Sequence, residues 1–265
     1  MKLRIATYNI HKGVSSFGSR PRIHALKQAL GTVAADLVFL QEVQGRHDLL
    51  ALRHSQLWPA QGQHEFLAGE TLHHAYGMNA VYDHGHHGNA LISNFPIASM
   101  RNQDVSDHAY EARGILHCVI DAPTTKVHCY VVHLGLFAGS RKRQTEALIE
   151  AVDQSSSSGE PIIIAGDFND WGNKLGNSLC GELGVCEVFD PQQVALASSH
   201  AARGIGGRRR GPIPPARTFP SLLPFLRLDR IYVRGFQVES AQVLRGGVWP
   251  RLSDHAPIVA NLALE

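Results

Sequence analysis

The chain begins with short apolar runs that each lead to a polar residue. Residues 3–10 (LRIATYNI) form one β-prone run, and residues 37–41 (LVFLQ) form a second that leads to Glu42. Between them, a stretch opened by Pro21 carries apolar residues at the spacing of one helix face. The pattern therefore predicts a strand, a helix and a second strand that ends at Glu42.

The same order returns in the second half of the chain. Residues 127–134 (VHCYVVHL) predict a strand, and residues 161–166 (PIIIAG) predict another. Residues 141–153 between them predict a helix, with Ser140 as its N-cap. A second strand–helix–strand unit is therefore expected here.

Four polar side chains fall at the ends of these predicted strands. Glu42 follows Asn9 by 33 residues, and Asp167 follows His133 by 34 residues. Such nearly equal spacing indicates a fold built from two similar halves. In layered α/β folds ligands bind at strand ends, so we expect these side chains at a site.

The remaining apolar runs predict a meander of hairpins and a closing set of strands. Gly, Asn, Pro or Asp punctuates the ends of most of them, as in successive hairpins. A weaker helical pattern covers residues 46–56. The predicted strands are 78–82, 89–93, 97–105, 113–120, one that begins at Asp229, 236–244 and 257–263.

One late segment differs in character from the rest. Residues 198–217 are rich in Gly and Pro and hold five arginines, which predicts a flexible basic loop inserted in one domain that spans residues 1–265. The apolar run 222–226 (LLPFL) follows it. This run suits either contact with a bilayer surface or packing in the core before a strand, and we favour the core.

Composition places the chain among ordinary folded proteins. It has 265 residues, 44% of them hydrophobic, and a net charge of +2, so any attraction to phosphate must be local. Its cysteines form no C-x-x-C pair, and Cys118 and Cys129 suit small buried hydrophobes. No apolar run reaches 18 residues and no signal-peptide core is present, so we expect a cytoplasmic protein, with peripheral membrane contact as an option.

Three short motifs carry the candidate chemistry. GDFN follows a buried strand and supplies Asp167 and Asn169, SDH supplies Asp254 and His255, and LDRIYV supplies Asp229. Taken one at a time, they also suit a turn, a polar loop and a surface ion pair. An aspartate beside a histidine, however, can bind a metal or orient a general base.

Seven motifs in a fixed order resemble those of the endonuclease/exonuclease/phosphatase superfamily, with its DNase-I-like fold. They span Thr7 to Pro257 and are TYNI (Asn9), QE (Glu42), GNALIS (Asn89), VVHLG (His133), GDFN (Asp167, Asn169), LDRIYV (Asp229) and SDH (Asp254, His255). The resemblance implies an α/β fold: a four-layer α/β sandwich of two packed mixed β-sheets with outer helices.

The chemistry of phosphate-ester hydrolysis and the resemblance together suggest a metal site. Glu42 is the best candidate ligand for Mg²⁺, with Mn²⁺ as an alternative, because hard cations prefer oxygen ligands. The resemblance implies Asn9 beside Glu42 and Asp254 nearby.

The same comparison implies the catalytic groups. His255 resembles the general base, oriented by Asp229. Asp167 would position the attacking water or a second metal, Asn169 would donate a hydrogen bond to a phosphoryl oxygen, and His133 would contact the phosphate or assist the leaving group.

Two departures from the superfamily pattern concern His11 and His133. His11 stands where some superfamily nucleases carry an aspartate that assists the metal, and no carboxylate is evident as the partner of His133.

The candidate substrate contacts form a separate set. They are Asn89, Arg113, His87, Arg208, Arg209 and Arg210, with the histidine run 84–87 interpreted as a polar loop at the site's rim rather than a zinc site.

These observations predict a divalent-metal-dependent phosphodiesterase that acts on nucleic acid or nucleotides. The alternative is the same chemistry on a phospholipid or phosphorylated headgroup, because arginines suit the phosphates of both. A non-catalytic binding module of the same fold is disfavoured, because such a module has no need for the complete set of catalytic residues.

Overall fold

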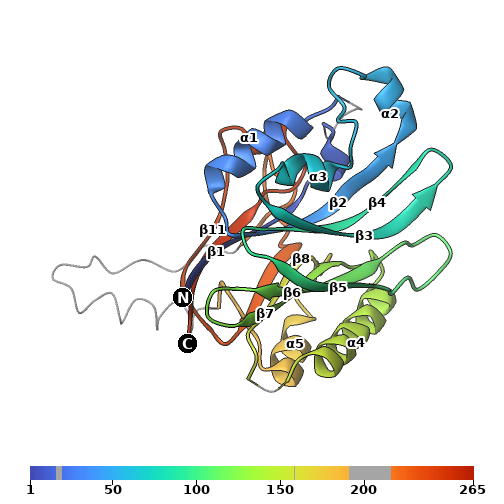
Figure 1. Cartoon of the computed structure of the whole chain (residues 1–265). Coiled ribbons are helices and arrows are strands. Elements are labelled where there is room, and N and C mark those ends of the chain that lie inside the picture. Colours follow the sequence, from blue (N-terminus) through green and yellow to red (C-terminus); the bar gives the residue numbers. More distant parts are fainter. Residues whose placement is uncertain (16–19, 158, 191–215) are drawn as a thin grey trace.

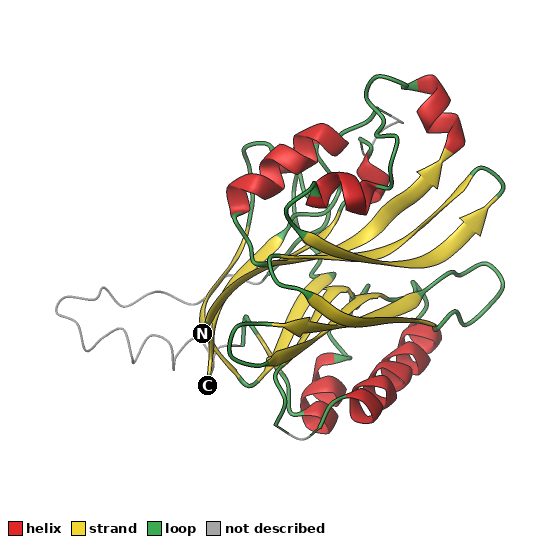
Figure 2. Ribbon diagram, in the orientation of Figure 1, coloured by secondary structure: helices red, strands yellow, loops and turns green. Residues whose placement is uncertain are grey.

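The computed structural model describes residues 1–15, 20–157, 159–190 and 216–265. Two β-sheets lie face to face in the middle of the molecule, and helices cover the outer face of each (Figures 1 and 2). The layers therefore run helix, sheet, sheet, helix. This arrangement is the predicted four-layer α/β sandwich, and both chain ends lie at the same side of it (Figure 1).

The first sheet has the strand order β11-β12-β1-β2-β4-β3. Its outer face carries three helices, seen above it in Figure 1. The strands are β1 (Lys2–Asn9), β2 (Leu37–His47), β3 (His73–Tyr82), β4 (Gly85–Ser93), β11 (Phe236–Val243) and β12 (Ile258–Leu264), and the helices are α1 (Ile23–Val33), α2 (Asp48–Arg53) and α3 (Gln63–Ala68).

The second sheet has the order β5-β6-β7-β8-β10-β9 and carries two helices on its own outer face. The strands are β5 (Ile97–Asp104), β6 (Gly114–Asp121), β7 (Lys126–His133), β8 (Ile162–Asp167), β9 (Cys186–Glu187) and β10 (Asp229–Arg234), and the helices are α4 (Ala138–Ser155) and α5 (Gly176–Leu183). Among the described helices, none is long and apolar enough to cross a membrane.

The core between the sheets is made by alternate side chains of strands from both. Ile5, Phe39 and Leu91 from the first sheet belong to one buried cluster with Val131 and Ile163 from the second. Each is completely buried, which stabilises the fold by roughly 1.5–3 kcal/mol per side chain relative to exposure. Cys118 and Cys129 belong to the same buried cluster with free thiols, as predicted.

The two halves repeat one motif, as the spacing of the polar residues predicts. β1 and β2 are parallel and joined through α1, and β7 and β8 are parallel and joined through α4. Asn9 stands opposite Gln41 in the first pair, and His133 stands opposite Asp167 in the second. Parallel strands present their carboxyl ends at one edge of their sheet, so each half delivers polar groups to one edge of its own sheet.

The sequence pattern predicts that the second strand ends at Glu42, but in the structure it does not. The β2–β4 register is irregular between Leu40 and Val43, and Glu42 has a φ of 55°. The strand then resumes and runs on to His47. This bulge aims Glu42 without ending the strand, and the predicted helix over 46–56 shortens to α2.

Two local predictions are wrong. Ser140 is not an N-cap: α4 begins at Ala138 after Phe137, and the buried Ser140 hydroxyl donates instead to Asp107 Oδ2 at 2.7 Å. The run 222–226 does not fill the core, because Leu222 and Leu223 are 80% and 77% exposed. Internal hydrogen bonds of a tight hairpin, rather than packing, hold this run in place.

Gly166 lets β7 and β8 approach at the end of their pairing. Its φ is 153°, and an added Cβ would lie 1.9 Å from the carbonyl oxygen of Val132. We expect Gly166→Ala to lower the free energy of unfolding by about 1–3 kcal/mol, because the residue must shift or remain strained. Gly31→Ala is the matched control: nothing lies within 4 Å of its added Cβ, and in α1 it should stabilise by roughly 0.5–1 kcal/mol. Urea denaturation measures both, and equal stability of the two variants would contradict the expectation.

Candidate active site

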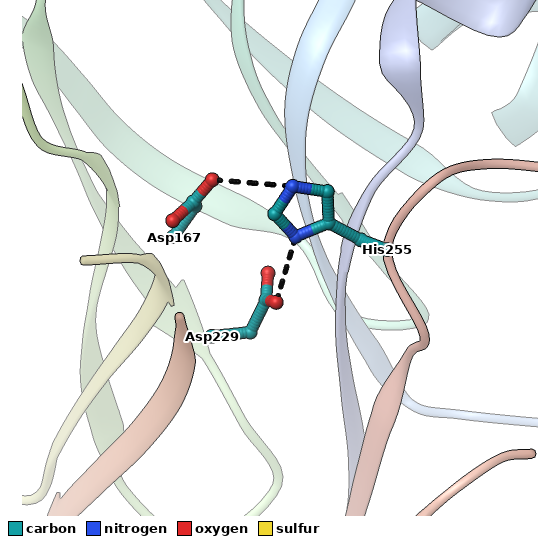
Figure 3. Close-up of side chains that lie close together, drawn as sticks. All are labelled: Asp167, Asp229 and His255. Carbon is teal, nitrogen blue, oxygen red and sulfur yellow. Dashed lines mark hydrogen bonds and ion pairs between the residues drawn. The ribbon is translucent and has the colours of Figure 1, made fainter. Parts of the chain in front are cut away.

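Three buried side chains meet where the two sheets face each other. Asp167 ends β8 and stands directly opposite Asp229, the first residue of the antiparallel β10. His255 comes from the loop before β12, in the other sheet. Figure 3 shows its imidazole between the two carboxylates: Nδ1 donates to Asp229 Oδ2 at 2.8 Å, and Nε2 lies 3.7 Å from Asp167 Oδ2. The predicted pairing of Asp229 with His255 is confirmed as geometry.

The carboxylates control the protonation of this cluster. Burial disfavours the charged imidazole, but the charges of Asp229 and Asp167 outweigh it and raise the pKa of His255 to about 10. Burial also raises the pKa of Asp167 to about 6, against the opposing charge of His255. Without a further cation, His255 is therefore an imidazolium at neutral pH.

A second group of polar residues adjoins this cluster through Asn9. The Asn9 amide donates to Asp167 Oδ2 at 3.2 Å and to Glu42 Oε1 at 3.3 Å. Since Asn9 ends β1 and Glu42 occupies the bulge of β2, the first sheet contributes both groups. The predicted metal residue Glu42 and the predicted catalytic residue Asp167 are thus joined by one side chain.

Asp254 reaches the same group through His11. His11 Nδ1 lies 3.2 Å from Asp254 Oδ1, and its backbone N–H donates to Asn9 Oδ1 at 3.1 Å. The hydrogen bond with Asp254 is the main cause of a raised His11 pKa. Burial pushes the pKa of Asp254 upward, but the His11 bond and nearby positive charge bring it below its ordinary value. His11 therefore acts here as a partner of a carboxylate.

The donor set of the site suits a hard divalent cation. Four carboxylates, Glu42, Asp167, Asp229 and Asp254, are linked by the contacts above, and Lys12, His11 and His255 supply the facing positive charge. Asp229 Oδ1 is buried without a hydrogen-bond partner. Within the described ranges, the one compact group of three or more metal-ligand side chains is Asp167, Asp229 and His255. The structure thus contains a buried acidic and histidine cluster able to hold a metal ion.

His133 and Asn169 flank Asp167. His133 Nε2 lies 3.6 Å from Asp167 Oδ2, so an aspartate stands where the sequence shows no partner. Burial, with positive charge from Arg113 and His255, lowers the His133 pKa well below its ordinary value, which keeps the ring neutral. Asn169 donates from its side chain to the Leu134 carbonyl at 2.9 Å and from its backbone to Asp167 Oδ1. One of its amide N–H groups is therefore already committed within the protein.

Of the predicted substrate contacts, Arg113 and His87 lie near each other, whereas Asn89 is buried between the sheets. Arg113, whose Nε donates to the Leu134 carbonyl at 3.1 Å, is close enough to His87 for its charge to act on the His87 pKa. Burial and the charge of Lys12 lower that pKa to about 4. Asn89 is buried, and its amide donates to the carbonyls of Gly114 and Val131, so it joins the two sheets.

The histidine run is only partly a loop: His84 lies in the turn between β3 and β4. His86 and His87 lie within β4, paired with Arg46 and Gln44 of β2 and with β3 on the other side. The flanking glycines serve this close pairing, since a Cβ on Gly88 would lie 1.8 Å from the Gly77 carbonyl oxygen. The predicted contacts Arg208, Arg209 and Arg210 lie outside the described residues.

Sequence reasoning missed two groups of the site. Lys12 Nζ lies 3.8 Å from Glu42 Oε2 and borders a pocket of about 310 Å³. The buried Ser253 hydroxyl donates to the Asn9 carbonyl at 2.6 Å and accepts from the His255 backbone N–H, which fixes the loop that carries His255. Lys12 lies in the segment NIHKG and Ser253 in the motif SDH. Their closeness in sequence to Asn9 and His255 was the one feature of the sequence that could have indicated them.

Comparison with known proteins agrees with this fold. The chain belongs to the Endonuclease/Exonuclease/phosphatase family, whose model matches residues 6–255, and so to a superfamily of phosphoesterases. It is 42% identical to the uncharacterized protein YbhP of Escherichia coli (strain K12), over 98% of this chain and 96% of that protein.

Solved structures share the fold at low sequence identity. The human Nocturnin catalytic domain with a bound sulfate anion is 16% identical with a TM-score of 0.72, covering 100% of this chain and 95% of that one. D. rerio TDP2 in complex with a single-strand DNA product is also 16% identical, with a TM-score of 0.66 and 99% of each chain covered. These likenesses establish the DNase-I-like architecture.

The raised pKa of His255 predicts how the stability of the metal-free protein depends on pH. Its folded pKa of about 10 exceeds the ordinary 6.5, so this contribution to stability is fully present below about pH 6.5 and is lost as pH rises through 10. In EDTA, urea denaturation should show wild type losing stability relative to His255→Gln between pH 7 and 10. Identical pH slopes for the two proteins would show that the imidazole is not held charged.

Proposed function

We propose that this protein is a divalent-metal-dependent hydrolase of phosphodiesters, with His255 as the general base. The observation that carries the proposal is the buried imidazole, with Nδ1 bound to Asp229 and Nε2 facing Asp167. A base needs one nitrogen fixed and the other directed at the reacting centre. A surface ion pair would need neither the burial nor the second carboxylate.

Each neighbouring residue has a proposed role in the same step. Neutral His255 takes a proton from the attacking water at Nε2, Asp229 fixes the ring through Nδ1, and Asp167 orients the water. Asn169 offers its remaining amide N–H to a phosphoryl oxygen. The neutral His133 contacts the phosphate or assists the leaving oxygen.

Glu42, with Asn9 and Asp254, would hold the metal, most simply Mg²⁺ with Mn²⁺ as a substitute. Bound there, it would neutralise charge on the phosphate and oppose the rise in the His255 pKa. The four linked carboxylates support this assignment, because an anionic substrate would be repelled without an added cation.

The substrate class proposed first is nucleic acid or nucleotides. Lys12 and Arg113 supply positive charge near Glu42 and His87, and the fold relative TDP2 was solved with a DNA product. The second candidate is a phospholipid or phosphorylated headgroup, which is favoured by the exposed Leu222 and Leu223. A non-catalytic binding module is disfavoured, because it would not need this buried charged cluster.

A substrate screen with Mg²⁺ and Mn²⁺ tests the proposed class directly. The panel is bis-p-nitrophenyl phosphate, p-nitrophenyl phosphate, single- and double-stranded DNA, RNA and phospholipids. Turnover of the diester but not the monoester supports the proposal, and the natural polymers and lipids then separate the two substrate classes. Metal-independent turnover, or none on any phosphate ester, would contradict it.

The pairing of His255 with Asp229 predicts non-additive losses of activity. His255→Ala should reduce kcat/KM by about 10²–10⁴-fold, because the base is removed. Asp229→Asn should cost less, because it only orients and tunes that base. The double variant should be little worse than His255→Ala alone, since Asp229 acts through the ring. Steady-state kinetics on one diester measures all three, and multiplicative losses would refute the shared role.

The metal assignment predicts a separate defect. Glu42→Gln should abolish metal-dependent turnover and weaken Mg²⁺ binding in calorimetry, while the fold is retained in circular dichroism. Glu65→Gln is a matched control, because Glu65 lies at the start of α3 and its side chain bonds only the Gly62 backbone N–H in the described contacts. Normal Mg²⁺ binding in Glu42→Gln would place the metal elsewhere.

A further inference from the structure

An apolar hairpin projects from the protein beside the candidate active site. We call residues 219–226 the apolar hairpin; its ends are joined by the bridge between Phe219 and Leu226. Its tip exposes three large hydrophobic side chains. They are Leu222 at 80%, Leu223 at 77% and Phe225 at 60% exposed. Soluble surfaces rarely gather such side chains in one short turn without a binding role.

The hairpin is held in a fixed position next to His255. The Phe219 ring lies 5.0 Å from the His255 ring, centroid to centroid. The Ser221 N–H donates to the Asp254 carbonyl at 2.7 Å, and the Ser221 hydroxyl donates to the Ser253 carbonyl. The exposed tip is thus built on the loop that carries the catalytic candidates.

Three backbone N–H groups of the hairpin are hydrogen-bonded within it. The N–H groups of Leu223, Phe225 and Leu226 donate to carbonyls of Pro220 and Phe219 at 2.9–3.1 Å. A segment whose donors are already paired can enter a low-dielectric environment without leaving them unsatisfied. The tip therefore carries apolar side chains on a backbone that does not need water at these three positions.

Arginines lie near the base of this hairpin, and of these Arg227 is paired with Glu187 at 2.8 Å. Residues 216–228 and 244–255, which the hydrogen bonds above join, contain four arginines and one acidic residue, Asp254. Arg217 and Arg251 are exposed, and Arg245 Nη2 donates to the Arg217 carbonyl, which brings it to the base of the hairpin. An apolar tip with exposed Arg217 and Arg251 near its base is complementary to an anionic lipid surface, which offers both phosphate and acyl chains.

We propose that the apolar hairpin docks this protein on the surface of an anionic lipid bilayer, with Leu222, Leu223 and Phe225 entering the acyl boundary. Arg217 and Arg251 would lie at the level of the headgroup phosphates. Two of the three exposed side chains at the tip are leucines, which suit acyl chains better than nucleobases, because nucleobases bind by stacking on aromatic rings. This docking does not depend on the proposed catalytic function.

Binding to vesicles tests the proposal with no catalytic readout. The metal-free full chain is sedimented with vesicles of phosphatidylcholine alone or mixed equally with phosphatidylglycerol. Wild type should bind the anionic vesicles, and Leu222→Asp combined with Leu223→Asp should weaken the partition about tenfold or more. Leu52→Asp is the matched control, because Leu52 is also 80% exposed but lies on α2, and it should bind as wild type does.

Two further variants keep the outcome decisive. Phe225→Trp retains an apolar tip, and the fluorescence of the added indole should shift to the blue on anionic vesicles. Arg217→Glu with Arg251→Glu should weaken binding and flatten its salt dependence. Failure of wild type to bind, equal loss in Leu52→Asp, or an unshifted indole signal in Phe225→Trp would overturn the proposal. A different result would also overturn it: wild type that is dimeric and binds no vesicles, and that becomes monomeric in the double aspartate variant. The tip would then contact a second copy of the chain.

Discussion

The antiparallel register that sets Asp229 opposite Asp167 is the constraint on which the site depends. Two carboxylates at neighbouring strand ends repel each other unless a cation lies between them. In the metal-free protein, the His255 imidazolium meets that need from the opposite sheet, and its pKa rises accordingly. The same ion contacts therefore tie the two sheets together at the site.

This constraint explains why the groups of the site come from such distant parts of the chain. β8 and β10 supply Asp167 and Asp229, and the loop before β12 supplies His255. Asn9 joins that cluster to Glu42, and the Ser253 hydroxyl joins the His255 loop to the Asn9 carbonyl. Displacing any one of these elements would move more than one functional group.

Sequence reasoning could predict the parts of the fold that local pattern dictates. The apolar periodicity indicated both strand–helix–strand units, and the nearly equal spacing of Asn9, Glu42, His133 and Asp167 indicated two similar halves. It could not place the bulge at Glu42, because a positive φ at a glutamate is imposed by strand pairing rather than by local preference. The same limit applies to Ser140, which favours an N-cap locally but bonds to Asp107 in the folded chain.

The run 222–226 shows a different limit of sequence pattern. A run of five residues with four hydrophobic ones suits either a buried core or an exposed tip. Periodicity cannot separate the two in so short a run. Tertiary hydrogen bonds decide: Ser221 is tied to the His255 loop, and the hairpin closes on itself through Phe219. The residues that follow are then free to face outward. A fold that must hold His255 between two acids thereby also fixes an apolar tip beside it, so the position of the site and the position of this surface are set by the same loop.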